Sequence, residues 1–140
     1  MTSINPYLNF AGNAEEAFSF YKEVFGGNYT KLIRFGDLKE GQELSPADKQ
    51  RIMHVALQIG EHAYLMGTDT LEAMGDGLAV GDHVFFYINA DSQEEASRLF
   101  DSLAVGGDVT MPLEQALWGH CSGMVKDRFG IHWMVSFKKG

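Results

Sequence analysis

The sequence predicts an α+β protein that contains two tandem βαβββ modules. One observation is an internal repeat: EEAFSFYKEVFGG at residues 15–27 returns as EEASRLFDSLAVGG at residues 94–107, with one inserted residue. The other is the setting of the repeat, because each copy follows one apolar, strand-like run and precedes three more. Two similar helices in equivalent settings indicate that one βαβββ unit occurs twice.

Both copies of the repeat have the pattern of an amphipathic helix. Apolar residues recur at helical spacing in each copy, namely Ala17, Phe18, Tyr21, Val24 and Phe25, then Ala96, Leu99, Phe100 and Leu103. Capping residues open both copies, Asn13 in the first and Asp91 with Ser92 in the second. A Gly-Gly pair closes each copy, as expected at a helix C-terminus. We therefore expect helices near residues 13–25 and 92–105.

Eight strand-like runs accompany these helices, at residues 4–10, 28–36, 51–60, 62–68, 83–89, 108–118, 120–127 and 131–137. The polar stretch between the second and third runs is expected to be a loop, in which Ser45-Pro46 caps a short helix. A Gly-rich linker, residues 75–82, joins the halves. The organisation is thus a single domain over residues 1–140, with module 1 at about 1–74 and module 2 at about 83–140.

Side-chain alternation separates two faces of the predicted strands. One face is apolar and suits the two helices, whereas the other mixes aromatic rings, Met, His and amides. Such a mixture is typical of a ligand cavity. We expect one cavity lined by Asn5, Tyr7, His54, Tyr64, Met66, His83, Phe85 and Met134. Trp118 is a further candidate, which either stacks on a ligand or anchors a dimer interface.

Composition excludes several classes of protein. The chain has 140 residues, of which 45% are hydrophobic and 21% are charged, and this argues against disorder. Its net charge of −8 opposes binding to nucleic acid or to anionic membranes. A single cysteine allows no internal disulfide, and neither a signal peptide nor an apolar membrane span is apparent. We expect a cytoplasmic protein.

Four stretches carry a family resemblance: PYLNFAGNAEEAFSFY, IMHVAL, LMGTD and LWGHCSGMVKDRFGIHWMV. Together they resemble the PhnB-like branch of the vicinal-oxygen-chelate (glyoxalase/bleomycin-resistance/dioxygenase) superfamily over nearly the whole chain. The segment from Trp118 to Met134 is the most specific part. The resemblance implies a glyoxalase-like fold, with curled mixed sheets around a shared cleft, and a homodimer.

The resemblance also implies where a divalent metal would bind, because superfamily enzymes take ligands from the first and last strands of each module. Those positions hold Asn5, Met66, His83 and Met134 here, so one strong ligand remains. Thioethers are poor ligands for hard cations such as Mg²⁺ and Mn²⁺. We therefore expect no tightly bound metal and no cofactor.

Three functions follow from these observations. The favoured one is a glyoxalase-like protein that binds a small molecule in the cleft without a metal. The alternative is a metal-dependent lyase, transferase or dioxygenase of the same superfamily, and a third possibility is a protein whose dimer surface is its function. Phosphate loops, dinucleotide fingerprints, serine elbows and CxxC motifs are absent from the sequence. The sequence leaves open whether a reaction is catalysed, and which one.

Overall fold

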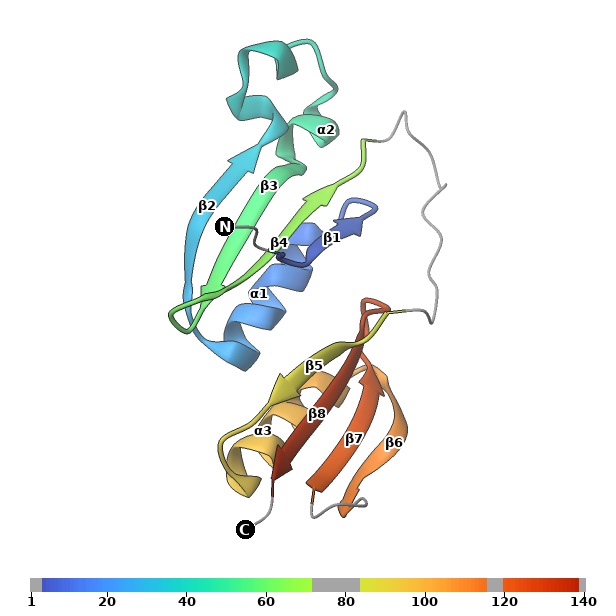
Figure 1. Cartoon of the computed structure of the whole chain (residues 1–140). Helices are drawn as coiled ribbons and strands as arrows, with labels where there is room; N and C mark the ends of the chain where they lie inside the picture. The colour runs from blue at the N-terminus through green and yellow to red at the C-terminus, as the bar shows by residue number, and fades with distance from the viewer. Residues whose placement is uncertain (1–3, 72–83, 116–119, 139–140) are drawn as a thin grey trace. The chain divides into compact units, whose positions relative to one another are not determined.

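The computed structural model describes residues 4–71, 84–115 and 120–138. The chain divides into two compact units, residues 1–79 and 80–140, which we describe separately. Each unit contains a four-stranded mixed sheet and one helix of twelve residues (Figure 1). The predicted α+β fold with two βαβββ modules is confirmed.

The first unit follows the order β-α-β-β-β, with a short helical excursion between its second and third strands. Its elements are β1 (Tyr7–Phe10), α1 (Ala14–Phe25), β2 (Asn28–Arg34), the 3₁₀ turns η1 (Phe35–Asp37) and η2 (Lys39–Gly41), α2 (Pro46–Gln50), β3 (Ile52–Ile59) and β4 (Ala63–Asp69). The strand order across the sheet is β1-β4-β3-β2. The pair β1–β4 is parallel, and the other two pairs are antiparallel.

The second unit repeats this topology. Its elements are β5 (Phe86–Asn89), α3 (Gln93–Ala104), β6 (Asp108–Gln115), β7 (His120–Lys126) and β8 (His132–Lys138). The strand order is β5-β8-β7-β6, with β5–β8 parallel and the other pairs antiparallel. Strand for strand, β5 to β8 therefore correspond to β1 to β4.

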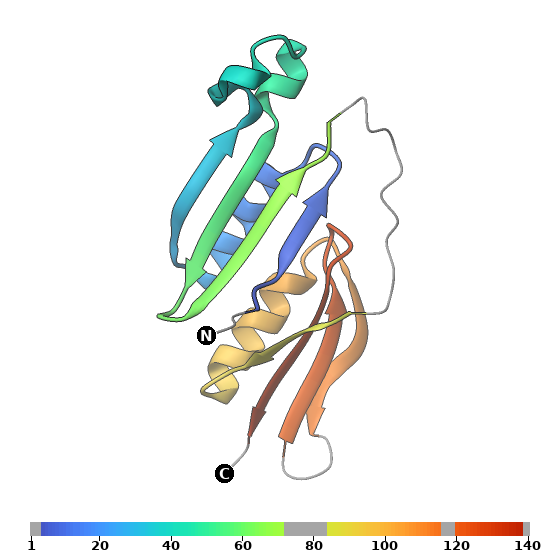
Figure 2. The same ribbon diagram turned by 45° about the horizontal axis from the view of Figure 1, so that its top comes forward.

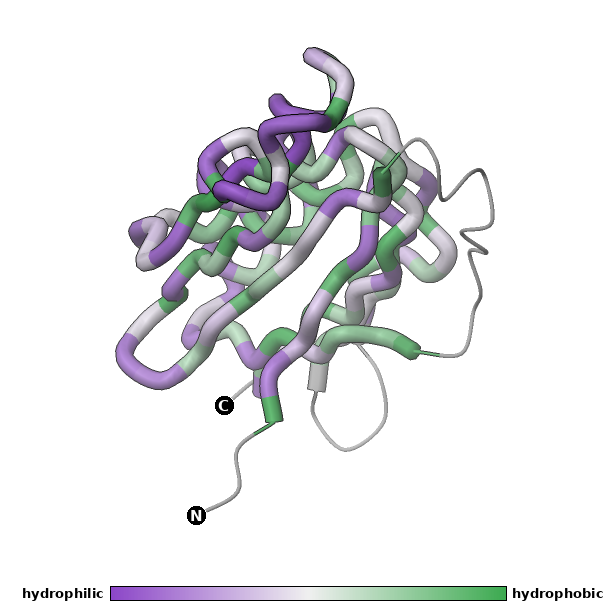
Figure 3. Tube along the Cα trace, turned by 90° about the horizontal axis from the view of Figure 1, so that it is seen from above, coloured by the Kyte–Doolittle hydropathy of each residue, from purple (hydrophilic) through white to green (hydrophobic). Residues whose placement is uncertain are grey.

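Each long helix covers one face of the sheet in its own unit (Figure 2). In the first unit the apolar stripe of α1 is buried, with Phe18 and Tyr21 at most 1% exposed, and the facing strands contribute Val55, Leu57 and Leu65. Full burial of such a side chain stabilises the fold by roughly 1.5–3 kcal/mol. Hydrophilic and hydrophobic segments are interspersed along the tube (Figure 3), and burial alternates along β1 and β4, as expected for a sheet whose two faces differ.

The two helices begin in different ways. The Ser92 hydroxyl accepts a hydrogen bond from the backbone N–H of Glu95 at 3.1 Å, as predicted for the cap of α3. The prediction that Asn13 caps α1 is wrong, because its side chain makes no capping hydrogen bond. The carboxylate of Asp69, at the end of β4, accepts from the backbone N–H of Ala14 instead. Sequence proximity favoured Asn13, whereas the true partner is 55 residues away from Ala14.

The Gly-Gly pairs end both helices for two separate reasons. The first glycine of each pair has a positive φ, 74° at Gly26 and 75° at Gly106, which residues with a Cβ adopt at a cost. The second glycine lies against the neighbouring sheet. A Cβ would stand 2.1 Å from a carbonyl oxygen of β3 at Gly27, and 2.3 Å from one of β7 at Gly107.

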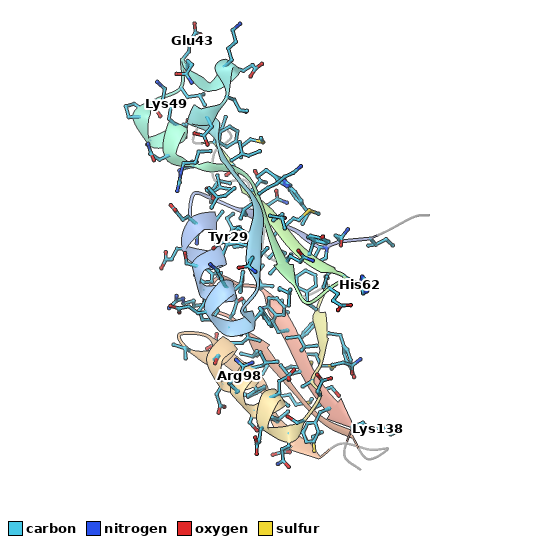
Figure 4. The ribbon with its side chains drawn as sticks, turned by 90° about the vertical axis from the view of Figure 1, so that its left-hand side faces the viewer. Tyr29, Glu43, Lys49, His62, Arg98 and Lys138 are labelled. Atoms are coloured by element: carbon cyan, nitrogen blue, oxygen red, sulfur yellow. The ribbon has the colours of Figure 1, made fainter. Side chains whose placement is uncertain are left out.

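The excursion between β2 and β3 contains the short helix that Ser45-Pro46 predicts. The Ser45 hydroxyl accepts a hydrogen bond from the N–H of Asp48 at 3.1 Å, and Pro46 occupies the first turn. Glu43 and Lys49 belong to this excursion and lie beyond the end of the sheet (Figure 4). The corresponding β6–β7 connection, residues 116–119, lies outside the described residues.

The described helices have at most twelve residues, and none is long and apolar enough to cross a bilayer, which takes about twenty. The expected cytoplasmic location and homodimer stay predictions.

Candidate functional site

The face of the first sheet that points away from α1 carries most of the site residues predicted in the first module. Gly67 marks the opposite, helix-facing side, because a Cβ there would stand 2.6 Å from the Phe18 ring of α1. Residues one or three positions away along β4, such as Met66 and Tyr64, therefore point away from the helix. We call this side the distal face of the sheet.

Register extends the distal face across the sheet. Met66 pairs with Tyr7 on β1 and with Ala56 on β3, and Ala56 pairs with Lys31 on β2. His54 follows by alternation along β3, two residues from Ala56. The structure thus brings the predicted residues Tyr7, His54, Tyr64 and Met66 onto one face, and half-buried Asn5 lies two residues before the start of β1. That they bind a ligand stays a prediction.

Tyr7 and His54 contact one another on this face. The Tyr7 hydroxyl lies 3.4 Å from His54 Nδ1, and the two rings stack with centroids 5.8 Å apart and an interplanar angle of 29°. Because β4 separates β1 from β3, the Tyr7 side chain must cross β4 to reach His54. Tyr7 remains 45% exposed. An aromatic ring lying across a sheet offers a flat contact surface and a polar end.

The second sheet has an equivalent distal face. Gly123 marks its helix side, because a Cβ there would stand 2.6 Å from the Phe100 ring of α3. Met134, one step from the register partner of Gly123, therefore lies on the distal face. Phe85 precedes β5, and its ring stands 4.8 Å from that of buried His132. Of the other predicted residues, His83 and Trp118 lie outside the described residues.

The two distal faces are copies of one another along their first two strands. In register, the paired residues are Tyr7 with Met66, Asn9 with Thr68, Tyr87 with Met134, and Asn89 with Ser136. In both units, therefore, a tyrosine on the edge strand pairs with a methionine on the next strand, and an asparagine pairs with a threonine or serine. Alternation alone identified Tyr7, Met66 and Met134. Alternation also predicted that Asn9, Tyr87 and Asn89 lie on the mixed faces, and the register adds which residues they pair with.

The faces differ on their remaining two strands. In the first sheet the Tyr–Met row continues through Ala56 to Lys31. In the second it continues through Met124 to Met111, so that three methionines from adjacent strands stand side by side, all partly exposed. Sequence reasoning missed this row, because its members come from three strands whose register the sequence does not reveal. Flexible, polarizable methionines form adaptable surfaces that favour aromatic contacts.

The buried carboxylates of the two units hold backbone N–H groups. Asp69 accepts from the N–H groups of Gly12, Ala14 and Ile52 at 3.0, 2.9 and 2.8 Å. Its side chain therefore ties the start of α1 to the start of β3. A carboxylate used in this way is structural, and it explains the end of the sequence stretch LMGTD.

Asp127 has the same role within the stretch DRFGIHW. Its Oδ1 accepts from the N–H groups of Phe129 and Ile131 at 2.8 and 3.0 Å, and its Oδ2 accepts from Trp133 Nε1 at 2.8 Å. The most specific part of the family resemblance thus encodes a turn and its anchor. Its presence is evidence for the fold and says little about chemistry.

One ion pair connects α1 to the end of β2. The Arg34 guanidinium donates to both oxygens of Glu15 and to the Gln50 carbonyl oxygen. The hydrogen bond from Arg34 lowers the pKa of Glu15, and the same bond raises the pKa of Arg34. On the helix side of β2, burial raises the pKa of Tyr29. These shifts belong to the helix side and not to the distal face.

The described residues contain no group of three or more His, Cys, Asp and Glu side chains that could hold a metal ion. Of the four positions to which the resemblance assigns metal ligands, three hold Asn5, Met66 and Met134, and the fourth, His83, lies outside the described residues. The residues present therefore fit a hard divalent cation poorly. The absence of a tightly bound metal stays a prediction.

The duplicated βαβββ topology defines the class of this protein as a glyoxalase-like fold. A family model described as 3-demethylubiquinone-9 3-methyltransferase matches residues 2–136, and the chain belongs to that family. The predicted resemblance to the PhnB-like branch of the vicinal-oxygen-chelate superfamily is confirmed.

Three similar proteins support this assignment. Protein YjdN of Escherichia coli K12 is 30% identical over 144 residues, covering 97% of this chain and 95% of YjdN. The crystal structure of protein PA1353 from Pseudomonas aeruginosa is 39% identical, with both chains covered completely and a TM-score of 0.83. A putative 3-demethylubiquinone-9 3-methyltransferase, PhnB protein, from Bacillus cereus shares the fold, with 23% identity, 97% and 99% coverage and a TM-score of 0.80.

Proposed function

We propose that this protein binds a small, partly aromatic molecule on the distal faces of its sheets, without a tightly bound metal. The observation that carries the proposal is the duplicated pattern of Tyr–Met and Asn–hydroxyl pairs on those faces. Aromatic rings and methionines supply contact area, and the asparagine amides supply directional hydrogen bonds. The hydroxyls bond within the sheets, Thr68 to the Met53 carbonyl oxygen at 2.8 Å and Ser136 to the Ser122 hydroxyl at 3.1 Å.

The exposure of the first distal face supports the same proposal. Tyr7 is 45% exposed, whereas Tyr21 on the helix side is fully buried. His54, Tyr64 and Met66 are each half-buried, so their side chains retain accessible surface.

Methyl transfer, which the family description names, receives no support from the described topology. Enzymes that use S-adenosylmethionine on a doubly wound fold bind it at the end of a parallel sheet, beside a Gly-rich strand-turn-helix. Here the described parallel pairs are β1–β4 and β5–β8, one in each sheet. The turn between β1 and α1 is held by Asp69, which accepts from Gly12 and Ala14.

The test is a titration of ¹⁵N-labelled protein with neutral aromatic probes, indole and 4-hydroxybenzamide, followed by amide chemical shifts. We expect saturable shifts in β3 and β4 and at least a tenfold loss of affinity in the double variant Tyr7→Ala/Tyr64→Ala. His62→Ala, in the exposed β3–β4 turn, is the control and should bind like wild type. Equal binding by the double variant would show that the distal face is not the site.

Metal analysis of protein purified without a histidine tag separates this proposal from the alternative, a metal-dependent enzyme. We expect less than about one tenth of an equivalent of any divalent metal, because thioethers and a lone imidazole bind hard cations weakly. A stoichiometric metal would favour the enzyme.

A further inference from the structure

The distal face of the first sheet carries a lysine and no acidic residue on its strands, although the protein as a whole is acidic. The chain as a whole carries a net charge of −8. The four described strands nevertheless place Lys31 and His54 on this face and no carboxylate, since Asp69 of β4 points to the helix side. A lone cation on a face without acids attracts anions, and more strongly where neighbouring side chains reduce the contact with water.

The groups that can donate hydrogen bonds lie close together on this face. Lys31 is in register with Ala56, and His54 is two residues from Ala56 on the same side of β3. Diagonal neighbours of this kind are about 7–8 Å apart, within reach of a long side chain. The Tyr7 hydroxyl lies 3.4 Å from His54 Nδ1. Lys31, His54 and Tyr7 thus occupy neighbouring register positions on one face, next to the small residue Ala56.

The second module shows that the fold does not require this arrangement. Its residues equivalent to Ala56 and Lys31 are Met124 and Met111, in the same register positions. Two sheets of the same topology thus combine the repeated Tyr–Met pair with different neighbours. The second distal face also carries a lysine, Lys126, but Lys126 stands in register with the acid Asp108, whereas Lys31 stands in register with Ala56. Among the described strands, a lysine in the row of the Tyr–Met pair therefore distinguishes the first face.

We propose that the first distal face recognises an aromatic carboxylate, whose ring lies against Tyr7 and whose anionic oxygens accept hydrogen bonds from Lys31 and His54. This inference rests on the proposed function and adds the charge of the ligand. Charge-assisted hydrogen bonds to a carboxylate are about twice as strong as neutral ones. The ring supplies contact area for Tyr7 and Met66.

The experiment compares two probes of nearly the same shape, anionic 4-hydroxybenzoate and neutral 4-hydroxybenzamide, by amide chemical shifts at low salt. Wild type is expected to bind the carboxylate at least fivefold more tightly than the amide. Lys31→Met, which installs the residue of the second module, should abolish this preference. Lys39→Met removes an exposed lysine of η2 and should keep the preference. Lys31→Gln repeats the test with a polar side chain.

The outcomes distinguish the two proposals. Equal binding of both probes by wild type, or a preference that survives in Lys31→Met and Lys31→Gln, would overturn the carboxylate inference and leave the proposed function standing. If neither probe shifts any amide of β3 or β4, both proposals are contradicted. A preference that Lys39→Met also loses would show that net charge, and not Lys31, attracts the anion.

Discussion

The two modules of this protein agree closely on the helix side of their sheets and diverge on the distal side. On the helix side each has an aromatic residue packed against a strand glycine, Phe18 on Gly67 and Phe100 on Gly123. Side chains buried between helix and sheet are closely packed, so adding or removing even one methylene group there lowers the stability of the fold. The helix side therefore reports on the fold that the modules share.

The distal faces of the two sheets share a pattern on their first two strands and differ on the other two. The Tyr–Met pair is repeated, but the row continues through Ala56 and Lys31 in one sheet and through Met124 and Met111 in the other. Ala56 is buried at 4% exposure, whereas Lys31 is exposed, and exposed positions tolerate substitution at little cost in stability. The difference teaches that helix packing determines the module, whereas the distal faces are free to acquire separate ligand chemistry.

The second glycine of each Gly-Gly pair gives the largest expected effect on the shared side. Gly27→Ala should reduce the free energy of unfolding by about 2–4 kcal/mol, because its Cβ would stand 2.1 Å from the Gln58 carbonyl oxygen. Gly107→Ala should do the same, since Lys126 O lies 2.3 Å from the corresponding position. Urea unfolding measures both.

Gly26→Ala is the matched control for this substitution. An added Cβ there meets nothing within 4 Å, so only the backbone conformation, φ 74° and ψ −146°, opposes it, at a cost of about 1–3 kcal/mol. If Gly27→Ala were no more harmful than Gly26→Ala, the close approach between helix end and sheet would not be the reason for the repeated glycines.

The buried aspartates give the next effect and separate the two modules. Asp69→Asn should cost about 2–3 kcal/mol, because the amide turns an NH₂ group toward a backbone N–H that lacks another acceptor within the site. Asp127→Asn should cost about the same, since it faces two N–H groups and Trp133 Nε1. Hydrogen exchange should show loss of protection in α1 and β3 for Asp69→Asn, and in β8 for Asp127→Asn. Identical exchange patterns in both variants would mean that the modules unfold as one unit.

The Glu15–Arg34 ion pair gives the smallest effect. Because Arg34 lowers the folded-state pKa of Glu15, the pair stabilises the fold above the ordinary carboxyl pKa of 4.5, and this contribution is lost as pH falls through the lowered value. Glu15 is 57% exposed, so Glu15→Gln should cost only about 0.3–1 kcal/mol at pH 7.

The measurement is urea unfolding of wild type and Glu15→Gln between pH 7 and pH 3, where the difference should shrink as the solution becomes acidic. Glu16→Gln is the control, because it removes the same charge from the same exposed helix turn. A difference for Glu15→Gln that grew on acidification would contradict the assigned direction of the pKa shift.

The sequence alone determined the modules, their order and the identity of the two faces. Helical periodicity located α1 and α3 within one residue at each end, and alternation placed Tyr7, Met66 and Met134 opposite the helices. These features depend on residues close together in the chain, whose spacing directly reflects the geometry of a helix or strand.

Only the tertiary structure decided which residues meet across the sheets. Asp69 replaces Asn13 at the start of α1, the Tyr–Met pairs stand in register, and Lys31 lies beside Ala56. Each of these contacts joins strands or helices that are distant in sequence. Register depends on how whole strands pair, and a one-residue slip reverses every face, so local patterns cannot fix it. The sequence could therefore predict which residues lie on the distal side of each sheet. Which of these residues contact one another became known only from the fold.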